Sequence, residues 1–201
     1  MKKTTTFLLR SRPVTLRAGS ALLLGAGLFV GAATPASAQI TEGCPPVPAG
    51  YVLDDHSADT AGLQNHVVVG GSNVYTIGTR FNDVIRGNAN NDIICALAGD
   101  DAVTGGTGAD VIYGLAGRDT LSGNEDRDTI TGGLDNDTLF GDGSTPSQFD
   151  TGDDLKGGKG NDDMFGGAGF DDIRGNEGHD TGDGEVDLGT CDPTVEQQTD
   201  C

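Results

Sequence analysis

An apolar residue recurs every nine positions through the middle of this chain, with one longer gap between Leu139 and Leu155, and an aspartate stands two positions before it in each copy. The apolar residues are Ile85, Ile94, Val103, Ile112, Leu121, Ile130, Leu139, Leu155, Met164 and Ile173. The aspartates are Asp83, Asp92, Asp101, Asp110, Asp119, Asp128, Asp137, Asp153, Asp162, Asp171 and Asp180. The last copy breaks down, because Gly182 takes the apolar position. A disordered acidic segment has no reason to keep an apolar residue in phase with its acids, so the pattern predicts a folded repeat.

Glycines recur at two positions of the same nine-residue repeat. The first, five residues before the aspartate, is filled by Gly78, Gly87, Gly105, Gly114, Gly123, Gly132, Gly157, Gly166 and Gly175, with Ala96 as an exception. The second, two residues before it, is filled by Gly99, Gly108, Gly117, Gly160, Gly169 and Gly178. Because glycine adopts positive φ angles at no steric cost, these six-residue stretches predict tight turns. The three residues that follow each turn predict a short strand with one inward side chain.

Short strands and turns that alternate in this way predict an all-β solenoid, in which each coil stacks on the last at the spacing of neighbouring strands. Its core is one file of aliphatic side chains on each side. A core this thin cannot by itself offset the conformational entropy that so many glycines lose on folding. A further stabilising interaction is therefore expected.

The stacked aspartates indicate which interaction this is. Bare carboxylates at strand spacing repel one another, whereas Ca²⁺ binds six to eight oxygen atoms, backbone carbonyls included. The turns are therefore predicted to bind calcium. Magnesium fits less well because it demands a regular octahedron. Zinc is not expected, because His56, His66 and His179 show no ligand spacing.

Charge and the N-terminal sequence bear on location and partners. The chain has 31 acidic and 12 basic residues, a net charge of −19, which argues against nucleic acid and anionic membranes as partners and favours cations.

Residues 1–38 combine a basic start, the apolar run 21–33 and the small-residue pattern "ASAQ", and they predict a cleaved secretory signal peptide. A retained membrane anchor is the alternative. The mature protein is expected to be extracellular or associated with the cell surface.

Three stretches, "GGTGADVIY" (105–113), "GGKGNDDMF" (157–165) and "GGAGFDDIR" (166–174), resemble the G-G-x-G-x-D-x-U-x nonapeptide of the RTX, or haemolysin-type, calcium-binding repeats. The resemblance extends over 78–183. It implies a right-handed parallel β-roll with two nonapeptides in each coil and calcium ions between turns stacked on one edge. With its N-terminal leader, the chain is most similar to the small secreted repeat proteins of Gram-positive bacteria.

The resemblance also assigns ligands. On one edge it implies Asp83, Asp101, Asp119, Asp137, Asp162 and Asp180; on the other it implies Asp92, Asp110, Asp128, Asp153 and Asp171. Backbone groups are implied at Gly99, Gly105, Gly108, Gly114, Gly117, Gly157, Gly160, Gly166, Gly169, Gly175 and Gly178. Asp126 and Asp135 replace the second glycine in two copies. They are either further ligands or solvated acids, and the second interpretation is favoured.

The remaining segments complete the organisation. A polar insertion within 141–154 is predicted to add no strand, so the edge assignment holds on both sides of it. Residues 39–77 and 184–201 are expected to cap the ends of the solenoid.

Four cysteines in an exported chain predict two disulfides. The favoured pairs are Cys44–Cys95, which ties the N-terminal segment to the second coil, and Cys191–Cys201, which closes the tail.

No catalytic motif is found in the sequence, so no enzymatic activity is expected. The sequence predicts a secreted calcium-binding protein whose folding is coupled to extracellular calcium. The alternative is a cell-surface adhesion or matrix protein that uses the calcium-folded roll as a scaffold for a partner. Neither hypothesis includes nucleic-acid binding or membrane insertion.

Overall fold

The computed structural model describes residues 43–62, 66–67, 72–143, 152–184, 190–191 and 195–199. The predicted signal peptide and the predicted Cys191–Cys201 disulfide lie outside the described residues. Nowhere in the described part of the chain does a helix reach the length and apolarity needed to span a bilayer.

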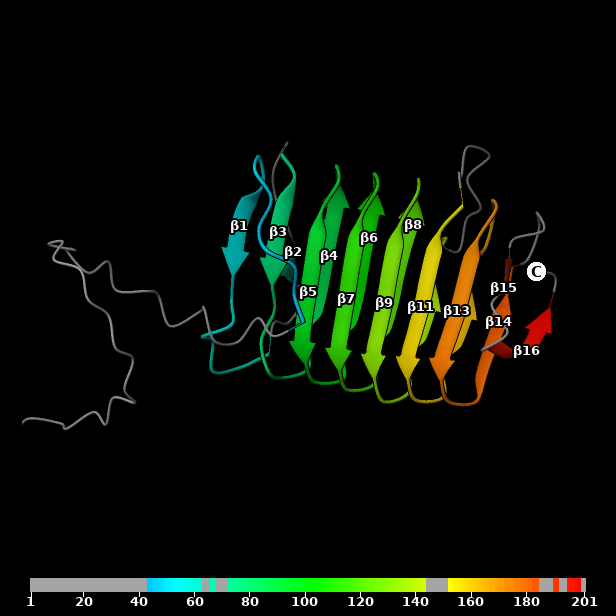
Figure 1. The fold of residues 1–201 in the computed structure, drawn as a ribbon. Coiled ribbons are helices and arrows are strands. Elements are labelled where there is room, and N and C mark those ends of the chain that lie inside the picture. Colours follow the sequence, from blue (N-terminus) through cyan, green and yellow to red (C-terminus); the bar gives the residue numbers. More distant parts are fainter. Residues whose placement is uncertain are drawn as a thin grey trace, which may run out of the picture. The chain divides into compact units, whose positions relative to one another are not determined.

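The described strands form two parallel sheets of eight strands, and successive strands alternate between them (Figure 1). The odd sheet contains β1 (Val52–Asp55), β3 (Val74–Ile77), β5 (Ile93–Ala98), β7 (Val111–Ala116), β9 (Thr129–Leu134), β11 (Asp154–Lys159), β13 (Asp172–Glu177) and β15 (Thr190–Cys191). The even sheet contains β2 (His66–Val67), β4 (Val84–Ala89), β6 (Ala102–Thr107), β8 (Thr120–Glu125), β10 (Thr138–Phe140), β12 (Asp163–Phe165), β14 (Asp180–Asp183) and β16 (Val195–Thr199). Two strands make one coil, which confirms the predicted parallel β-solenoid.

The strand register follows the repeat. Ile112 pairs with Ile94 on one side and with Ile130 on the other, so each coil contains two nonapeptides. Most repeat strands are six residues long rather than the predicted three, because pairing continues from the strand into the turn. In β5 and β7, for example, Leu97 pairs with Leu115. Stacked turns of the same conformation keep their backbone groups in register, and this extends the ladder of hydrogen bonds.

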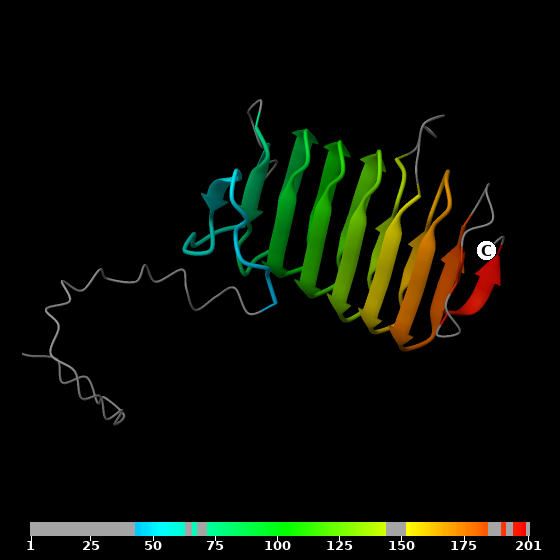
Figure 2. The same ribbon diagram turned by 45° about the horizontal axis from the view of Figure 1, so that its top comes forward.

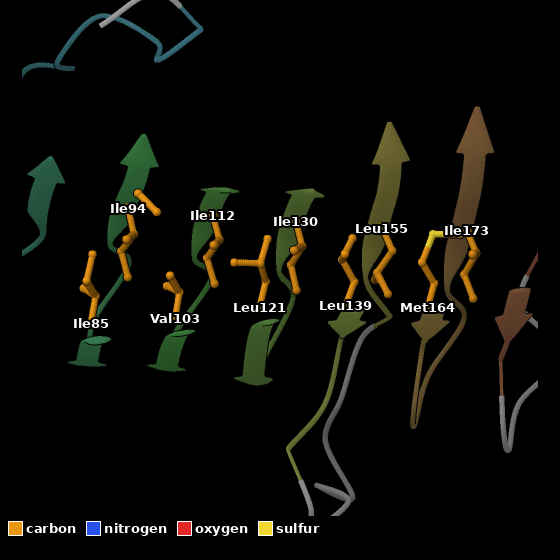
Figure 3. Close-up of a cluster of buried hydrophobic side chains, with 11 residues drawn as sticks. Ile85, Ile94, Val103, Ile112, Leu121, Ile130, Leu139, Leu155, Met164 and Ile173 are labelled. Atoms are coloured by element: carbon orange, nitrogen blue, oxygen red, sulfur yellow. The ribbon is translucent and has the colours of Figure 1, made fainter. Parts of the chain in front are cut away.

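Two files of aliphatic side chains fill the space between the sheets, one from each sheet (Figure 3). The ten apolar residues predicted from the repeat are all at most 2 % exposed. In Figure 3 the residues of the odd sheet, such as Ile112, face those of the even sheet, such as Leu121. The predicted core is therefore confirmed.

A second apolar cluster lies on the other face of the odd sheet. Cys95 and its neighbours in β3 and β5 are buried there, with Cys44 and Tyr51 of the N-terminal segment packed against them. A disulfide joins Cys44 to Cys95, as predicted, with their Cα atoms 6.1 Å apart. The hydroxyl of Tyr75 also donates to the carbonyl oxygen of Pro45 at 2.6 Å. The segment that begins at Gly43 thus covers the first coils of the odd sheet.

The insertion leaves the frame of the solenoid unchanged. Leu155 after it pairs with Ile130 before it, and Met164 pairs with Leu139. The coil that contains the insertion brings together residues 25 apart, against 18 elsewhere. Among the described residues on either side of 144–151 the insertion adds no strand, as predicted.

The thin core makes stability sensitive to single core residues. We expect Ile112→Ala to lower the free energy of unfolding by about 2–5 kcal/mol, through lost burial and the cavity left behind, and Ile112→Val by about 0.5–1.5 kcal/mol. Urea unfolding in excess calcium measures both. Leu134→Ala, at a side chain 48 % exposed, is the control and should change stability by less than about 0.5 kcal/mol. Equal losses at positions 112 and 134 would contradict the assignment of the core.

Candidate metal centre

The turns between the strands stack along the two edges of the solenoid (Figure 2), and the repeat aspartates at the ends of these turns form two ladders of hydrogen bonds. In each ladder the backbone N–H of one aspartate donates to Oδ1 of the aspartate one coil further on. One ladder joins Asp83, Asp101, Asp119, Asp137, Asp162 and Asp180 at 2.7–2.9 Å. The other runs from the N–H of Val74 through Asp92, Asp110, Asp128, Asp153 and Asp171 at 2.7–2.8 Å. The structure therefore stacks the two sets of aspartates that the sequence grouped together.

The second oxygen of the ladder carboxylates is buried as well. Every ladder aspartate is at most 3 % exposed. Within the described protein, Oδ2 has no hydrogen-bond partner at Asp92, Asp101, Asp110, Asp119, Asp137, Asp162 and Asp180. A buried, unpartnered carboxylate oxygen is costly unless a cation or a proton neutralises it. The donor set thus fits a hard cation that binds oxygen.

Burial raises the pKa of these carboxyl groups. Desolvation is the main cause, and nearby carboxylates add to it, while the backbone N–H bond acts in the opposite direction. The pKa rises to about 8 at Asp101 and Asp137, to about 7 at Asp110 and Asp119, and to about 6 at Asp162. In the absence of metal, protons therefore compete for these sites near neutral pH.

The first glycine of each turn makes room for the carboxylate. A Cβ atom at Gly114 would lie 2.2 Å from Oδ2 of Asp119 and 2.8 Å from the carbonyl oxygen of Gly132. Gly114 has no positive φ, so its role is steric rather than conformational. The sequence interpretation, which assigned this glycine to turn conformation, is corrected here. The Asp119 carboxylate and the Gly132 carbonyl, which come from adjacent coils, both lie beside Gly114 and so place two oxygen ligands close together.

The second glycine position serves the backbone conformation. Gly117 has φ +123°, a region that L-residues rarely adopt. Asp126 and Asp135 occupy this position with φ 75° and 74°, and aspartate tolerates such left-handed conformations better than most residues. Both are exposed, and Oδ2 of Asp126 accepts the N–H of Gly108 at 3.1 Å. Their placement fits the interpretation as solvated acids.

Asp83 differs from the other ladder members. The backbone N–H of Thr79 donates to its Oδ2 at 2.7 Å, and the hydroxyl of Thr79 donates to its Oδ1 at 2.9 Å. Its turn, "GTRFND", lacks the second glycine. The turn is therefore closed by its own side-chain hydrogen bonds.

Sequence reasoning missed several residues of this region. Gly141 acts as first glycine for Asp153, since a Cβ there would lie 2.2 Å from Oδ2 of Asp153. The insertion separates the two and conceals the pairing. A further row of side-chain oxygens, one residue before the ladders, accepts N–H groups of the next coil at Asn82, Asn91, Asp100, Asn136 and Asn161. The frequent Asn or Asp at this position was a signal available in the sequence.

A second group of metal-ligand side chains lies outside the repeats. Asp54, His56 and His66, the histidine cluster, place one ligand atom each within 4.8 Å of one another. The spacing of the histidines along the sequence, from which zinc was not expected, gave no sign of this group. Spacing along the chain concealed the cluster, because β1 and β2 belong to different sheets.

The fold and the ladders define a class of protein: a parallel β-solenoid with acidic, glycine-rich turns stacked along both edges. The sequence model of the RTX calcium-binding nonapeptide repeat (4 copies) matches residues 77–103, 104–139 and 149–186, just over half of the chain. The chain therefore belongs to the RTX calcium-binding nonapeptide repeat family. No curated protein and no solved structure matches it.

The raised pKa values predict that acid stabilises the metal-free fold. An aspartate whose pKa is higher in the folded state binds more protons when folded. Its stabilising effect is complete below about pH 4, the ordinary aspartate pKa, and is lost as the pH rises through about 6–8. In EDTA we expect more β signal in far-UV circular dichroism, and more resistance to urea, at pH 5 than at pH 8. Equal or greater stability at pH 8 would contradict the burial of charged ladders.

Proposed function

We propose that the protein is a secreted calcium-binding protein whose folding is coupled to extracellular calcium. The observation that carries the proposal is the pair of buried carboxylate ladders, in which the second oxygen has no hydrogen-bond partner among the described residues at seven aspartates. The proposed ligands are Asp92, Asp101, Asp110, Asp119, Asp128, Asp137, Asp153, Asp162, Asp171 and Asp180, with carbonyl oxygens of the turn glycines. Asp83 is left out because Thr79 already donates to both of its oxygens.

Calcium suits the ladders through its charge and its tolerance of irregular geometry. When bound, it supplies the positive charge that the buried carboxylates require, and it links consecutive coils. Carboxylate and carbonyl oxygens are hard ligands of the kind that calcium selects. Magnesium retains its water molecules and demands a regular octahedron, so it fits a stack of wide turns less well.

The coupling of folding to calcium follows from charge. A chain with a net charge of −19 gains little from a core of two thin files, and burial of its ladders without cations adds a further cost. Because the ligands converge only when coils stack, the free energy of calcium binding contributes directly to folding. Extracellular calcium modules bind with dissociation constants of about 10⁻⁴–10⁻³ M. Such a chain stays unfolded where calcium is scarce and folds after export.

Two features support a location outside the cell. The Cys44–Cys95 disulfide is typical of oxidising compartments. The N-terminal sequence has the three-part pattern of a secretory signal peptide. This leader favours the small secreted Gram-positive type of repeat protein.

A calcium titration tests the coupling. Starting from the full chain in EDTA at pH 7.5, we expect a cooperative rise of β signal in far-UV circular dichroism with Ca²⁺ and little change with Mg²⁺. Cooperativity is expected because each ion bridges two coils and so prepares the next site. A chain fully folded in EDTA, or one that responds equally to both ions, would refute the proposal.

Replacement of one ladder charge gives a sharper test. Asp119→Asn keeps an oxygen to accept the N–H of Asp101 and removes the buried charge. We expect more β signal in EDTA at pH 7.5, because a neutral amide costs less to bury. We also expect the midpoint of the calcium titration to rise about tenfold, since ligand charge tunes calcium affinity.

Asp135→Asn is the matched control, because Asp135 is exposed and asparagine also tolerates its left-handed backbone. Its charge acts on Asp119 and Asp137 only as a minor cause beside burial, so it should change both readouts much less than Asp119→Asn does. If the two variants behave alike, Asp119 is not a calcium ligand.

A further inference from the structure

At the N-terminal end of the solenoid, the residues at the inward-facing positions are polar rather than aliphatic. In the odd sheet, Ile94 is aligned with Thr76, and Thr76 with Asp54. In the even sheet, Ile85 is aligned with His66. The positions that hold aliphatic side chains throughout the repeats therefore hold an aspartate and a histidine at the N-terminal end. Polar residues at core positions are costly unless they bind a partner.

The side chains of these residues converge. Nε2 of His66 lies 2.7 Å from Oδ2 of Asp54, and Nε2 of His56 lies 2.9 Å from Oδ1 of the same carboxylate. The two imidazole rings pack edge to face with centroids 4.7 Å apart. All three side chains are partly buried, from 20 to 33 % exposed. Two nitrogens and a carboxylate thus face one another across the end of the core.

Both ring nitrogens of His56 lie within hydrogen-bond distance of a carboxylate oxygen. Its Nδ1 lies 2.9 Å from Oδ2 of Asp59, while its Nε2 faces Asp54. Both neighbours are carboxylates, which only accept, and a neutral imidazole has a single N–H. With Nδ1 donating to Asp59, the short contact between Nε2 and Asp54 requires either a second proton on the ring or a cation in its place. A metal ion bound by both atoms would replace that second proton.

A second, independent observation comes from the same file. Thr76 is 1 % exposed, and its hydroxyl oxygen has no hydrogen-bond partner among the described residues. It lies directly beside Asp54 in the strand register. The strand next to the histidine cluster therefore holds an unsatisfied buried polar group beside a set of metal-ligand side chains.

We propose that Asp54, His56 and His66 bind a zinc-type transition-metal ion at the N-terminal end of the solenoid. Imidazole nitrogens with one carboxylate are the ligands of zinc, whereas calcium selects oxygen. A tetrahedral zinc ion with bonds of about 2.1 Å sets its ligand atoms about 3.4 Å apart. The three atoms already lie within 4.8 Å of one another, and the nitrogen–oxygen contacts of 2.7 and 2.9 Å would open by about half an ångström to admit the ion. Asp59 is a positioning residue, because a carboxylate on the second ring nitrogen orients a metal-bound histidine.

The ion would close the open end of the core. Asp54 belongs to β1 of the odd sheet and His66 to β2 of the even sheet, and these are the terminal strands of the two sheets. A metal bound by both joins the sheets where the aliphatic files stop. This site is distinct from the calcium ladders in place and in ligand chemistry.

Zinc titration by calorimetry tests the proposal on the full chain, purified without a polyhistidine tag and held in excess calcium. We expect saturable binding of about one Zn²⁺ per chain, and visible ligand-field absorption when Co²⁺ is added instead. His56→Gln, His66→Gln and Asp54→Asn should each weaken zinc binding at least about tenfold, and Asp59→Asn about 10- to 100-fold. Circular dichroism in calcium verifies that each variant is folded.

His179→Gln is the matched control, because His179 is exposed in the turn between β13 and β14. It should bind zinc like the unchanged chain. Should a ligand variant fail to fold, Asp59→Asn decides, since Asp59 is 51 % exposed and outside the ligand set. Absence of saturable zinc binding to the folded chain, or equal weakening by His179→Gln, would overturn the proposal. Because calcium is present throughout, the result is independent of the calcium titration.

Discussion

The structure depends on one constraint: at both edges of the stack, coil after coil buries an aspartate carboxylate. The backbone N–H of the preceding coil satisfies Oδ1, and this bond fixes how consecutive coils stack. At Asp101 and Asp137, for example, Oδ2 has no partner in the described protein, and burial raises the pKa of these groups to about 8. The fold therefore needs protons or cations at its edges, and its repeat sequence is arranged around that need.

Several features of the repeat follow from this constraint. The first glycine has no side chain because the carboxylate oxygen occupies the position that a Cβ would take, as at Gly114. The second glycine position, two residues before the aspartate, has a left-handed backbone in most copies. Glycine, asparagine and aspartate adopt this conformation more easily than residues with bulky side chains do. The insertion is tolerated because Gly141 and Asp153 still meet across it. Loop length matters less than preservation of the contact around the carboxylate.

The coils at the N-terminal end differ from the others in their side chains. The turn at Asp83 is closed by Thr79, and the outer face of β3 and β5 is covered by a segment that the Cys44–Cys95 disulfide holds in place. The inward positions of β1 and β2 hold Asp54 and His66 in place of aliphatic residues. A solenoid that adds identical coils has no intrinsic end. Non-repeat residues must therefore supply the contacts that a further coil would have made.

The nine-residue period by itself determined the stacked coils, the two aliphatic files and the frame across the insertion, and the resemblance to the RTX repeats implied the parallel roll and the grouping of the aspartates into two ladders. These features could be predicted because every coil repeats the same local information, so that a contact across 18 residues is already present in the period. The sequence also favoured the Cys44–Cys95 pair. Only the tertiary structure decided why Gly114 is a glycine, that Thr79 binds Asp83, and that His56 and His66 meet at Asp54. Those contacts are made by side chains that no period relates, and their partners become neighbours only once β1 and β2 take their places in opposite sheets.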